Sequence, residues 1–448
     1  MSSPESIPLP VHVISLGCPK NFVDTEGILG AMGLLCHGLR IVDDPAAARL
    51  LVVNTCAFIE PAVSESVETI IGLGETKKEG QILAVTGCLV WRYGREKLKE
   101  LLPEVDLFLD IRDPLKRGSF IASMVGCCDC SGAEAGFSRV AGSTVRFLAS
   151  HPWQRYLKIA EGCSNRCTYC LIPKIRGPLQ CRSPESVLEE ARVLEEQGAR
   201  EITLVAQDLT AYNYSGEELT DLLEKLIANT SVPWFRLLYL YPERLSEGLI
   251  RLIAREPRIC PYLDIPIQHA SPRILHSMGR SYDPARLYEL VEMVRDSLPD
   301  VAIRSTVITG FPGETDQDFH LLTEAIQRLA FDHLGCFVYW DEEGAAASRL
   351  PDKVPVELAE ERREHIMELQ AEISMERNRR FRNRILQVLV DGPCEETDLL
   401  LCGRSRFQAP EIDGQVYINS GVATPGEIAR VKITESHQYD LIGHIIED

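Results

Sequence analysis

The sequence lacks several features that would assign it to a class of protein at once. It has no apolar run long enough to cross a membrane, and its start, MSSPESIPLP, shows neither a signal peptide nor an Arg-rich transit peptide. We therefore expect a cytoplasmic protein. Positive charge is also scarce, because 47 Lys and Arg residues stand against 66 Asp and Glu residues, which gives a net charge of -19. Such a chain repels phosphate backbones unless it has a basic face, so nucleic-acid binding is disfavoured, whereas a basic protein partner is not.

The composition is that of a folded globular protein. Hydrophobic residues make up 45% and charged residues 25% of the 448 residues, and this length favours two or three domains. Fifteen cysteines are the unusual component. Because a reducing compartment does not sustain a disulfide framework, we interpret these cysteines as metal ligands and buried thiols.

Residues 10–121 are predicted to form an α/β domain. Short β-rich runs alternate there with amphipathic helical patterns, and this alternation indicates a parallel sheet. The runs are VHVISL, LLVVN, ILAVT and DLFLD.

Three cysteines occupy the same place in three of these units. Cys18, Cys56 and Cys88 each follow a β-rich run closely, and ligands of an open parallel sheet bind outside the carboxyl ends of its strands. Gly17 and Gly87 precede two of them and would let the backbone turn tightly beside a bulky inorganic group. We therefore predict a metal site with three cysteine ligands. The alternative is that the three thiols pack as small apolar side chains.

Residues 149–380 are predicted to form a second α/β domain. Helical patterns separate six β-rich runs, and six β/α units indicate an incomplete parallel barrel. Such barrels build their sites from the loops at the carboxyl ends of the strands. The runs are RYLKIA, EITLVAQ, FRLLYLY, YLDIPIQ, VAIRSTVITG and HLGCFVYW.

A second group of three cysteines follows the first of these runs directly. Cys163, Cys167 and Cys170 lie in EGCSNRCTYC, at a spacing that lets three thiolates bind one iron–sulfur cluster. Electron-transfer clusters usually take four protein thiolates, so a three-thiolate site leaves an iron open and favours an enzyme. A zinc site is the alternative, and it would need a fourth ligand, for which Cys181 is nearest in sequence.

The segment around this motif is basic. Between residues 154 and 182 there are six Lys and Arg residues and a single Glu. Positive charge would stabilise an anionic thiolate cluster, and a solvated basic face is the alternative.

Residues 381–447 are predicted to form a small antiparallel β-barrel. Short alternating runs are broken there by Gly, Pro and Asp. From Arg384 onward five basic residues stand against eleven acidic ones, so this domain is better suited to a basic protein than to phosphates. The runs are ILQVLV, QVYIN, EIARVKI and YDLIGHII.

The cysteine motif at 163–170, with Tyr169 before its third cysteine, resembles the signature of the radical S-adenosylmethionine superfamily. The resemblance implies that the three thiolates hold a [4Fe–4S] cluster whose fourth iron binds S-adenosylmethionine. It also implies cleavage of that cofactor to a 5′-deoxyadenosyl radical. Tyr169, and Gly310 in GFPGET, are candidates for contacts with S-adenosylmethionine, because GFPGET follows a strand and opens a helix.

The whole chain resembles the methylthiotransferases of that superfamily, which carry two [4Fe–4S] clusters and replace a C–H bond by C–S–CH3. The resemblance assigns the first cluster to Cys18, Cys56 and Cys88, and the tail resembles a TRAM domain. The segments SLGCPKN, NTCAFIEPAVSES, IPKIRGP, YLDIPIQHASPRIL, IRSTVITGFPGETDQDF and APEIDGQVYIN resemble the branch that modifies the β-carbon of an aspartate of small-subunit ribosomal protein twelve.

Other functions remain open at this point. The first alternative is the branch of the family that modifies adenosine in transfer RNA. The second is a protein without catalytic activity, either an iron–sulfur electron carrier or a zinc-binding module. Neither the sulfur donor nor the reductant is evident from the sequence.

The remaining cysteines are expected to have no role in chemistry. Residues 122–148 are predicted to be a linker, and its Cys127, Cys128 and Cys130 are interpreted as incidental thiols, with a third metal site as the alternative. Buried packing is predicted for Cys36, Cys260, Cys336, Cys394 and Cys402.

Overall fold

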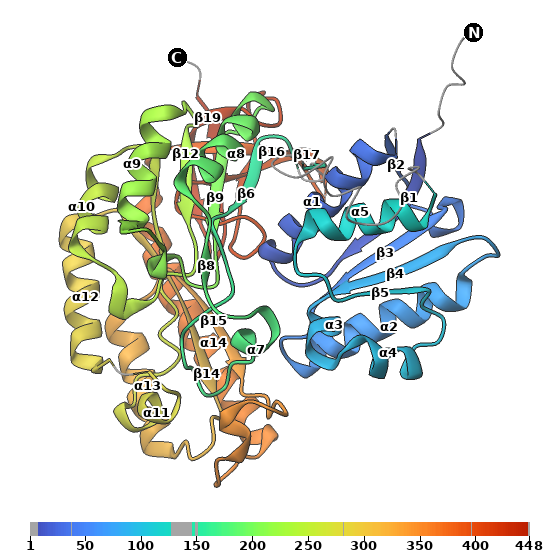
Figure 1. Cartoon of the computed structure of the whole chain (residues 1–448). Helices are drawn as coiled ribbons and strands as arrows, with labels where there is room; N and C mark the ends of the chain where they lie inside the picture. The colour runs from blue at the N-terminus through green and yellow to red at the C-terminus, as the bar shows by residue number, and fades with distance from the viewer. Residues whose placement is uncertain are drawn as a thin grey trace. The chain divides into compact units, whose positions relative to one another are not determined.

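The computed structural model describes residues 8–36, 38–126, 146–147, 151–280, 282–395 and 397–446 (Figure 1). The chain divides into two compact units, each with its own parallel sheet. Within the described residues no helix combines the length and the apolar character needed to cross a membrane. The first unit comprises Met1–His151, Glu161–Ser164 and Leu171–Gln180, and the second comprises Pro152–Ala160, Asn165–Cys170 and Cys181–Asp448.

The first unit is built on a five-stranded parallel sheet with strand order β2-β1-β3-β4-β5. The predicted parallel α/β fold is confirmed. Strand β2 is an addition, because three residues are too few to produce a periodic pattern. Helices α1 and α5 cover one face of the sheet, and α2, α3 and α4 cover the other (Figure 1). The bounds are β1 Leu9–Ser15, α1 Pro19–Leu35, β2 Leu39–Ile41, β3 Leu50–Thr55, α2 Glu60–Thr76, β4 Ile82–Gly87, α3 Cys88–Tyr93, α4 Arg95–Leu101, β5 Leu107–Leu109 and α5 Pro114–Met124.

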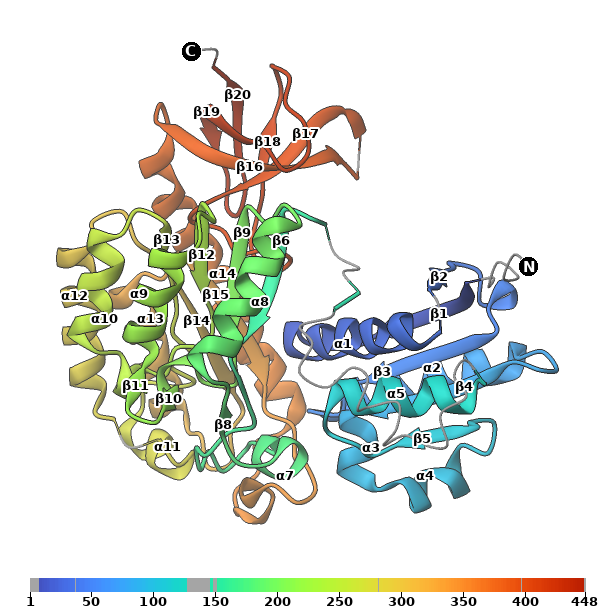
Figure 2. The ribbon, with the colours of Figure 1, turned by 45° about the horizontal axis from the view of Figure 1, so that its top comes forward.

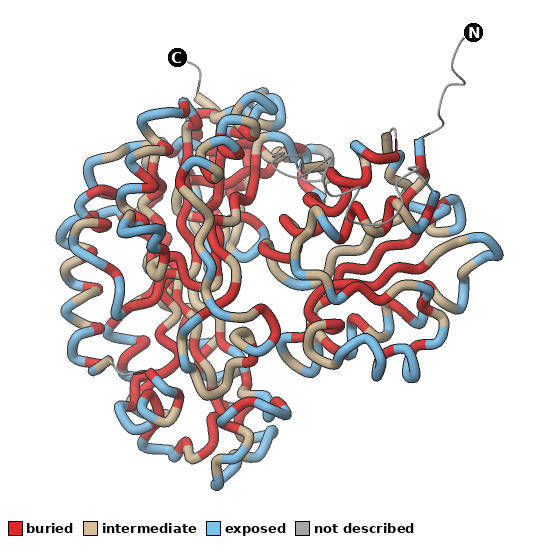
Figure 3. Tube along the Cα trace, in the orientation of Figure 1, coloured by how far each residue is buried: buried red, intermediate tan, exposed pale blue. Residues whose placement is uncertain are grey.

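Burial on both faces explains why the strands of this sheet are apolar throughout. All six residues of β3 are buried, as expected for a parallel strand covered by helices on each side. Figure 3 shows this burial along the central strands. On one face, Ile28 and Met32 of α1 and Ile121 of α5 pack against Val11 and Val52 in one core. The order of the strands reverses between β1 and β3, and ligands of such sheets bind beside that reversal.

The second unit contains six parallel strands in the order β15-β14-β13-β12-β9-β6, which confirms the predicted incomplete barrel. Helices α9, α10 and α12 lie side by side on one face of this sheet (Figure 2). The bounds are β6 Gln154–Lys158, α8 Pro184–Glu196, β9 Glu201–Val205, α9 Leu219–Asn229, β12 Trp234–Leu237, α10 Glu247–Arg255, β13 Ile259–Asp264, α11 Pro272–Ser277, α12 Pro284–Ser297, β14 Ala302–Thr309, α13 Asp316–Leu329, β15 His333–Val338 and α14 Val356–Asn378. The short elements between them in sequence are β7 Ala160–Glu161, α7 Ile172–Arg176, β8 Gln180–Cys181, β10 Asn213–Tyr214 and β11 Glu217–Glu218, of which α7 belongs to the first unit.

The last five strands of the second unit form a closed barrel, β16-β17-β18-β20-β19, around an apolar core that includes Val388, Val416 and Val431. The predicted small barrel is confirmed with one difference, because β18 and β20 pair in parallel while the other pairs are antiparallel. The bounds are β16 Ile385–Cys394, β17 Thr397–Ser405, β18 Val416–Ile418, β19 Ile428–Ser436 and β20 Leu441–Ile445.

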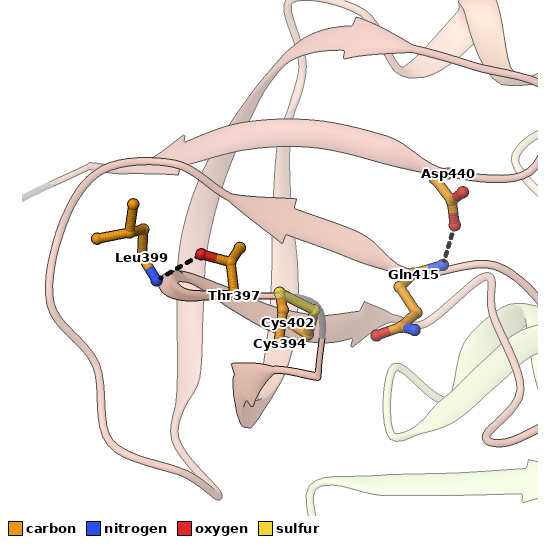
Figure 4. Close-up of a disulfide and its surroundings, with 6 residues drawn as sticks. All are labelled: Cys394, Thr397, Leu399, Cys402, Gln415 and Asp440. Carbon is orange, nitrogen blue, oxygen red and sulfur yellow. Dashed lines mark hydrogen bonds between the residues drawn. A yellow bond between two sulfur atoms is a disulfide. The ribbon is translucent and has the colours of Figure 1, made fainter.

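Cys394 and Cys402 form a disulfide between β16 and β17, eight residues apart in sequence (Figure 4). Their interpretation as independently packed thiols was therefore wrong. The two strands form a hairpin, and its register places Cys402 opposite Gly392 and Cys394 opposite Thr397, so both thiols lie at the same end. Both cysteines are buried.

Buried ion pairs hold the closed barrel against the six-stranded sheet. Arg236 of β12 donates through Nε to Oε1 of Glu201 at 2.5 Å, and Arg404 of β17 donates to Oε2 of the same carboxylate at 2.8 Å. Nearby, Tyr262 of β13 donates its hydroxyl to Asp413 at 2.7 Å. The domain boundaries proposed from the sequence stay a prediction, and Cys127, Cys128 and Cys130 lie outside the described residues.

Candidate functional site

Cys18, Cys56 and Cys88 stand at the carboxyl ends of three adjacent strands. Cys18 precedes α1, Cys56 follows the last residue of β3, and Cys88 is the first residue of α3. The strands end almost level, because Ser15 pairs with Asn54 and Thr55 with Gly87. The three thiols are close enough to influence one another electrostatically, and their role as ligands of one metal site stays a prediction.

Gly17 and Gly87 make room for this convergence. Both have positive φ angles, +89° and +96°, a conformation that side chains with a Cβ rarely adopt. A Cβ at Gly17 would lie 2.8 Å from the sulfur of Cys56, and one at Gly87 would lie 2.5 Å from the side chain of Asn54. The expected tight turns beside the cysteines are therefore present.

Buried polar side chains fix the loops that carry these thiols. Asn21 donates to the carbonyl of Leu16 at 2.8 Å, and Asn54 donates in return to the carbonyl of Asn21 at 2.9 Å. The hydroxyl of Ser66 in α2 accepts a hydrogen bond from the N–H of Cys56 and donates one to the carbonyl of the same residue. These hydrogen bonds fix the backbone of the loops that carry Cys18 and Cys56.

The pKa values of the three thiols are shifted in different directions. Burial raises the pKa of Cys56 to about 11, and burial also raises the pKa of Cys88. For Cys18, burial is again the largest effect, but the positive charges of Lys20 and Arg176, together with backbone N–H groups, outweigh it and lower the pKa. The positive charge of Arg176 acts to lower the pKa of all three thiols.

The donor set suits an iron–sulfur cluster better than a single ion. Among the described residues, no three His, Cys, Asp or Glu side chains are arranged to hold one metal ion. A four-iron cluster bonds each thiolate to a different iron, so its ligand sulfurs stand further apart. Three soft thiols and the buried guanidinium of Arg176 fit such a group. So does Gly17, where an added Cβ would collide with Cys56.

The loop that carries Cys167 and Cys170 is held from several sides within the second unit. The N–H of Thr168 donates to the carbonyl of Met278 at 2.9 Å, and its hydroxyl donates to the carbonyl of Ser277 at 2.7 Å. The N–H of Cys170 donates to the carbonyl of Cys167 at 3.2 Å. This bracing keeps both thiols in a fixed turn at the carboxyl end of β6.

Tyr169 lies between these two cysteines and is bonded to Arg280. The guanidinium donates two hydrogen bonds to its hydroxyl, at 3.3 and 3.2 Å. Burial raises the pKa of Tyr169 well above its usual range, and the positive charge of Arg280 opposes this rise without cancelling it. The hydroxyl is therefore a neutral acceptor for Arg280. A contact between Tyr169 and S-adenosylmethionine stays a prediction.

Cys163 falls in the first unit, where its N–H donates to the carbonyl of Gly177 at 3.1 Å. Gly162 before it has φ +71°, and a Cβ there would lie 2.2 Å from the carbonyl oxygen of Pro178. Convergence of Cys163 with Cys167 and Cys170 stays a prediction. Cys181, the candidate zinc ligand, accepts a hydrogen bond from the N–H of Asn213.

Gly310 has a structural role of its own. It has φ +75°, and a Cβ there would lie 2.3 Å from the Cβ of Ala359 in α14. Its N–H donates to the carboxylate of Glu314 at 3.0 Å, so this donor is already used within the GFPGET turn. A contact between Gly310 and S-adenosylmethionine stays a prediction, and a hydrogen bond donated by this N–H would require it to change partners.

The basic segment 154–182 is not a uniformly solvated face. Arg155 and Arg176 are buried, and Arg182 donates to Glu190 at 2.5 Å. Arg176 points to the first group of cysteines rather than serving as a general counter-charge. The contacts of Arg176 and Arg280 were not predicted from the sequence. The only local signal for Arg176 is its position shortly after Cys170, and Arg280 is remote in sequence from the cysteines that it approaches.

Family models match three parts of the chain. The radical SAM superfamily matches residues 157–326, the uncharacterized protein family UPF0004 matches residues 10–110, and the TRAM domain matches residues 384–446. The first of these segments contains β9, β12, β13 and β14 of the second sheet, the second covers nearly the whole first sheet, and the third contains the closed barrel.

Solved structures show the same fold at low sequence identity. The radical S-adenosylmethionine methyltransferase TsrM from Kitasatospora setae, with cobalamin and a [4Fe–4S] cluster bound, superposes with a TM-score of 0.52 at 14% identity. The match covers 74% of this chain and 75% of that one.

Curated relatives are much closer. The ribosomal protein uS12 methylthiotransferase RimO of Desulfotalea psychrophila is 45% identical over 97% of this chain and 99% of its own. RimO of Geobacter sulfurreducens is also 45% identical, over 97% and 98%, and RimO of Myxococcus xanthus is 43% identical, over 98% and 92%. At this identity over nearly the whole length, the chain belongs to the RimO family of radical S-adenosylmethionine methylthiotransferases, enzymes that depend on S-adenosylmethionine and iron–sulfur clusters.

Proposed function

We propose that this enzyme attaches a methylthio group to the β-carbon of an aspartate in ribosomal protein uS12. The observation that carries the proposal is the near full-length identity to relatives that are named for this substrate. The acidic barrel supports it independently, because ribosomal proteins are basic. We also propose that the enzyme acts in the cytoplasm, where ribosomal proteins are made.

Two [4Fe–4S] clusters are part of the proposal. Cys18, Cys56 and Cys88 would hold the first, and the motif Cys163, Cys167 and Cys170 would hold the second. When bound, the second cluster and S-adenosylmethionine supply the one-electron chemistry that activates an unreactive C–H bond. This chain's own residues would bind and orient these groups. In the first site Cys88 is buried, and Cys18 and Cys56 are half-buried.

The surface of the closed barrel favours a protein partner over RNA. Three of its five basic residues are used against the rest of the second unit, so their charge is not offered to a phosphate backbone. Arg404 pairs with Glu201, Arg406 donates to the carbonyls of Pro257 and Ile259, and Arg384 pairs with Asp300. The side chains of Glu395, Glu411, Glu427 and Glu435 are exposed. This acidic surface complements a basic ribosomal protein and repels transfer RNA.

Mass spectrometry of two cell fractions tests the proposed substrate. Ribosomal proteins and transfer RNA are isolated from cells that lack this gene and from the same cells expressing it. The expected result is a peptide of uS12 whose aspartate gains the mass of SCH3 in place of H, only when the gene is expressed. A methylthio group on adenosine, with uS12 unmodified, would contradict the proposal and establish the transfer-RNA alternative.

A further inference from the structure

We propose that Arg176 is the residue that sets the electrostatics of the first cluster, by placing a buried positive charge against its three cysteine ligands. The inference rests on the proposed function, because it takes Cys18, Cys56 and Cys88 as cluster ligands. It assigns a positioning role to a residue that follows the second cysteine motif in sequence.

The guanidinium of Arg176 is held in place by several partners within the first unit. It donates to Asn21 at 3.1 Å, to Asp24 at 3.3 Å and to Glu161 at 2.9 Å, and the side chain is buried. It also stacks 5.3 Å from the ring centre of Trp91 in α3. A side chain with this many partners has little freedom to move, so its charge is fixed relative to the thiols.

Arg176 is the arginine that the three thiols share. It acts electrostatically on each of them and makes a side-chain hydrogen bond with Cys88. Asn21, which receives one of its hydrogen bonds, also donates to the loop before Cys18. Arg176 therefore supports both the charge of the ligands and the backbone that carries them.

Two further arginines lie against the same Trp91 ring without this relationship to the thiols. Arg117 is fully buried and donates to Thr86, and its guanidinium lies 3.7 Å from Asp24. Arg112 is exposed and stands 5.4 Å from the ring centre. Arg112 is consequently a matched control of the same chemistry on the same ring.

The charge of Arg176 has a definite consequence for a bound cluster. Three thiolates make the cluster anionic, and reduction adds a further negative charge in a buried, low-dielectric site. A fixed positive charge stabilises the reduced form more than the oxidised form and so raises the reduction potential. Asp24 lies beside Arg176, and its negative charge acts on Cys88 in the opposite direction, so Asp24 should lower the reduction potential.

The test isolates the first cluster in the full-length chain. In a background with Cys163→Ala, Cys167→Ala and Cys170→Ala, only the first site can bind a cluster after anaerobic reconstitution. Iron content, the electron paramagnetic resonance spectrum and the midpoint potential are then measured for Arg176→Gln, Arg176→Lys, Asp24→Asn and the control Arg112→Gln.

The expected potentials shift in opposite directions. Arg176→Gln should lower the midpoint potential, Asp24→Asn should raise it, and Arg176→Lys and Arg112→Gln should stay near the background value. A residue with a merely structural role would not produce opposite signs, and Asp24→Asn keeps the test available if Arg176→Gln fails to fold. Unchanged potentials, or shifts of one sign, would overturn the inference. If the background chain binds no iron, the proposed first cluster itself is wrong.

Discussion

Arg404 of the closed barrel and Glu201 of the six-stranded sheet are joined by a hydrogen bond of 2.8 Å between Nη1 and Oε2, buried from solvent. The other carboxylate oxygen of Glu201 accepts from Arg236. Burial works against ionisation of Glu201, but the two guanidinium groups outweigh it and lower its pKa. The carboxylate of Glu201 in β9 thus connects Arg236 of the neighbouring strand β12 to Arg404 of the closed barrel, 203 positions further along the chain.

The first prediction concerns this link. Glu201→Gln leaves two buried guanidinium groups without their counter-charge and should cost about 3–5 kcal/mol of unfolding free energy. Thermal unfolding of the purified chain, followed by circular dichroism, measures the effect. Glu217→Gln is the control, because the pair of Glu217 with Lys225 is solvent-exposed and should matter little. Equal unfolding temperatures for both variants would show that the triad does not hold the barrel in place.

The second prediction separates the two groups of cysteines. Cys163→Ala should abolish formation of 5′-deoxyadenosine from S-adenosylmethionine, because that motif is proposed to bind the cofactor. Cys56→Ala should retain this cleavage but lose methylthio transfer. The wild-type chain should bind about eight iron atoms, and each variant should lose about half of them. Cleavage that survives in Cys163→Ala would contradict the assignment of the motif.

The third prediction concerns the contact between Gly17 and Cys56. Gly17→Ala places a Cβ 2.8 Å from the Cys56 sulfur and should therefore reduce the iron bound by the first site. Gly80→Ala is the matched control, since Gly80 has a similar φ of +84° but nothing within 4 Å of an added Cβ. Both variants should lose about 1–2 kcal/mol of stability to the left-handed backbone conformation. Only Gly17→Ala should lose iron; equal iron content in the two variants would refute the steric argument.

The fourth prediction concerns the disulfide between Cys394 and Cys402. It closes a loop of eight residues, and the loop-closure relation assigns it about 2.5 kcal/mol. Under non-reducing conditions, Cys394→Ser with Cys402→Ser should lower the unfolding temperature of the barrel. With a reductant present, wild type and variant should unfold at the same temperature. Peptide mapping after alkylation reports whether the bond forms in the cell, and two alkylated cysteines there would restrict it to oxidising conditions.

Much of the fold could be predicted from the sequence because its signals are local. The β-rich runs correspond to strands of both sheets, and the position of Cys18, Cys56 and Cys88 after their runs was enough to predict convergence, since parallel strands end at one edge. The tight turns at Gly17 and Gly87 could be predicted because a glycine directly before a candidate ligand is a local signal, which does not depend on residues that are distant in sequence.

Other features could not be predicted because they depend on residues far apart in sequence. Arg176 and Asn21 are separated by 155 positions, and nothing local to either residue indicates their contact. The parallel pairing of β18 with β20 follows from how the barrel closes, which alternating runs do not encode. The disulfide depends on the register of one hairpin, and register is set by turn geometry.

The sequence by itself determined the fold class, the two groups of cysteines and the acidic character of the tail, because composition, spacing and periodicity are properties of the chain alone. Only the tertiary structure decided which charges face which thiols. Arg176, six residues after Cys170 in sequence, belongs to the first unit, where it faces Cys18 and Cys88. Burial gives these contacts of Arg176 a large energetic weight, because a guanidinium removed from water is stable only beside anionic partners. The fold brings those partners from distant segments of the chain.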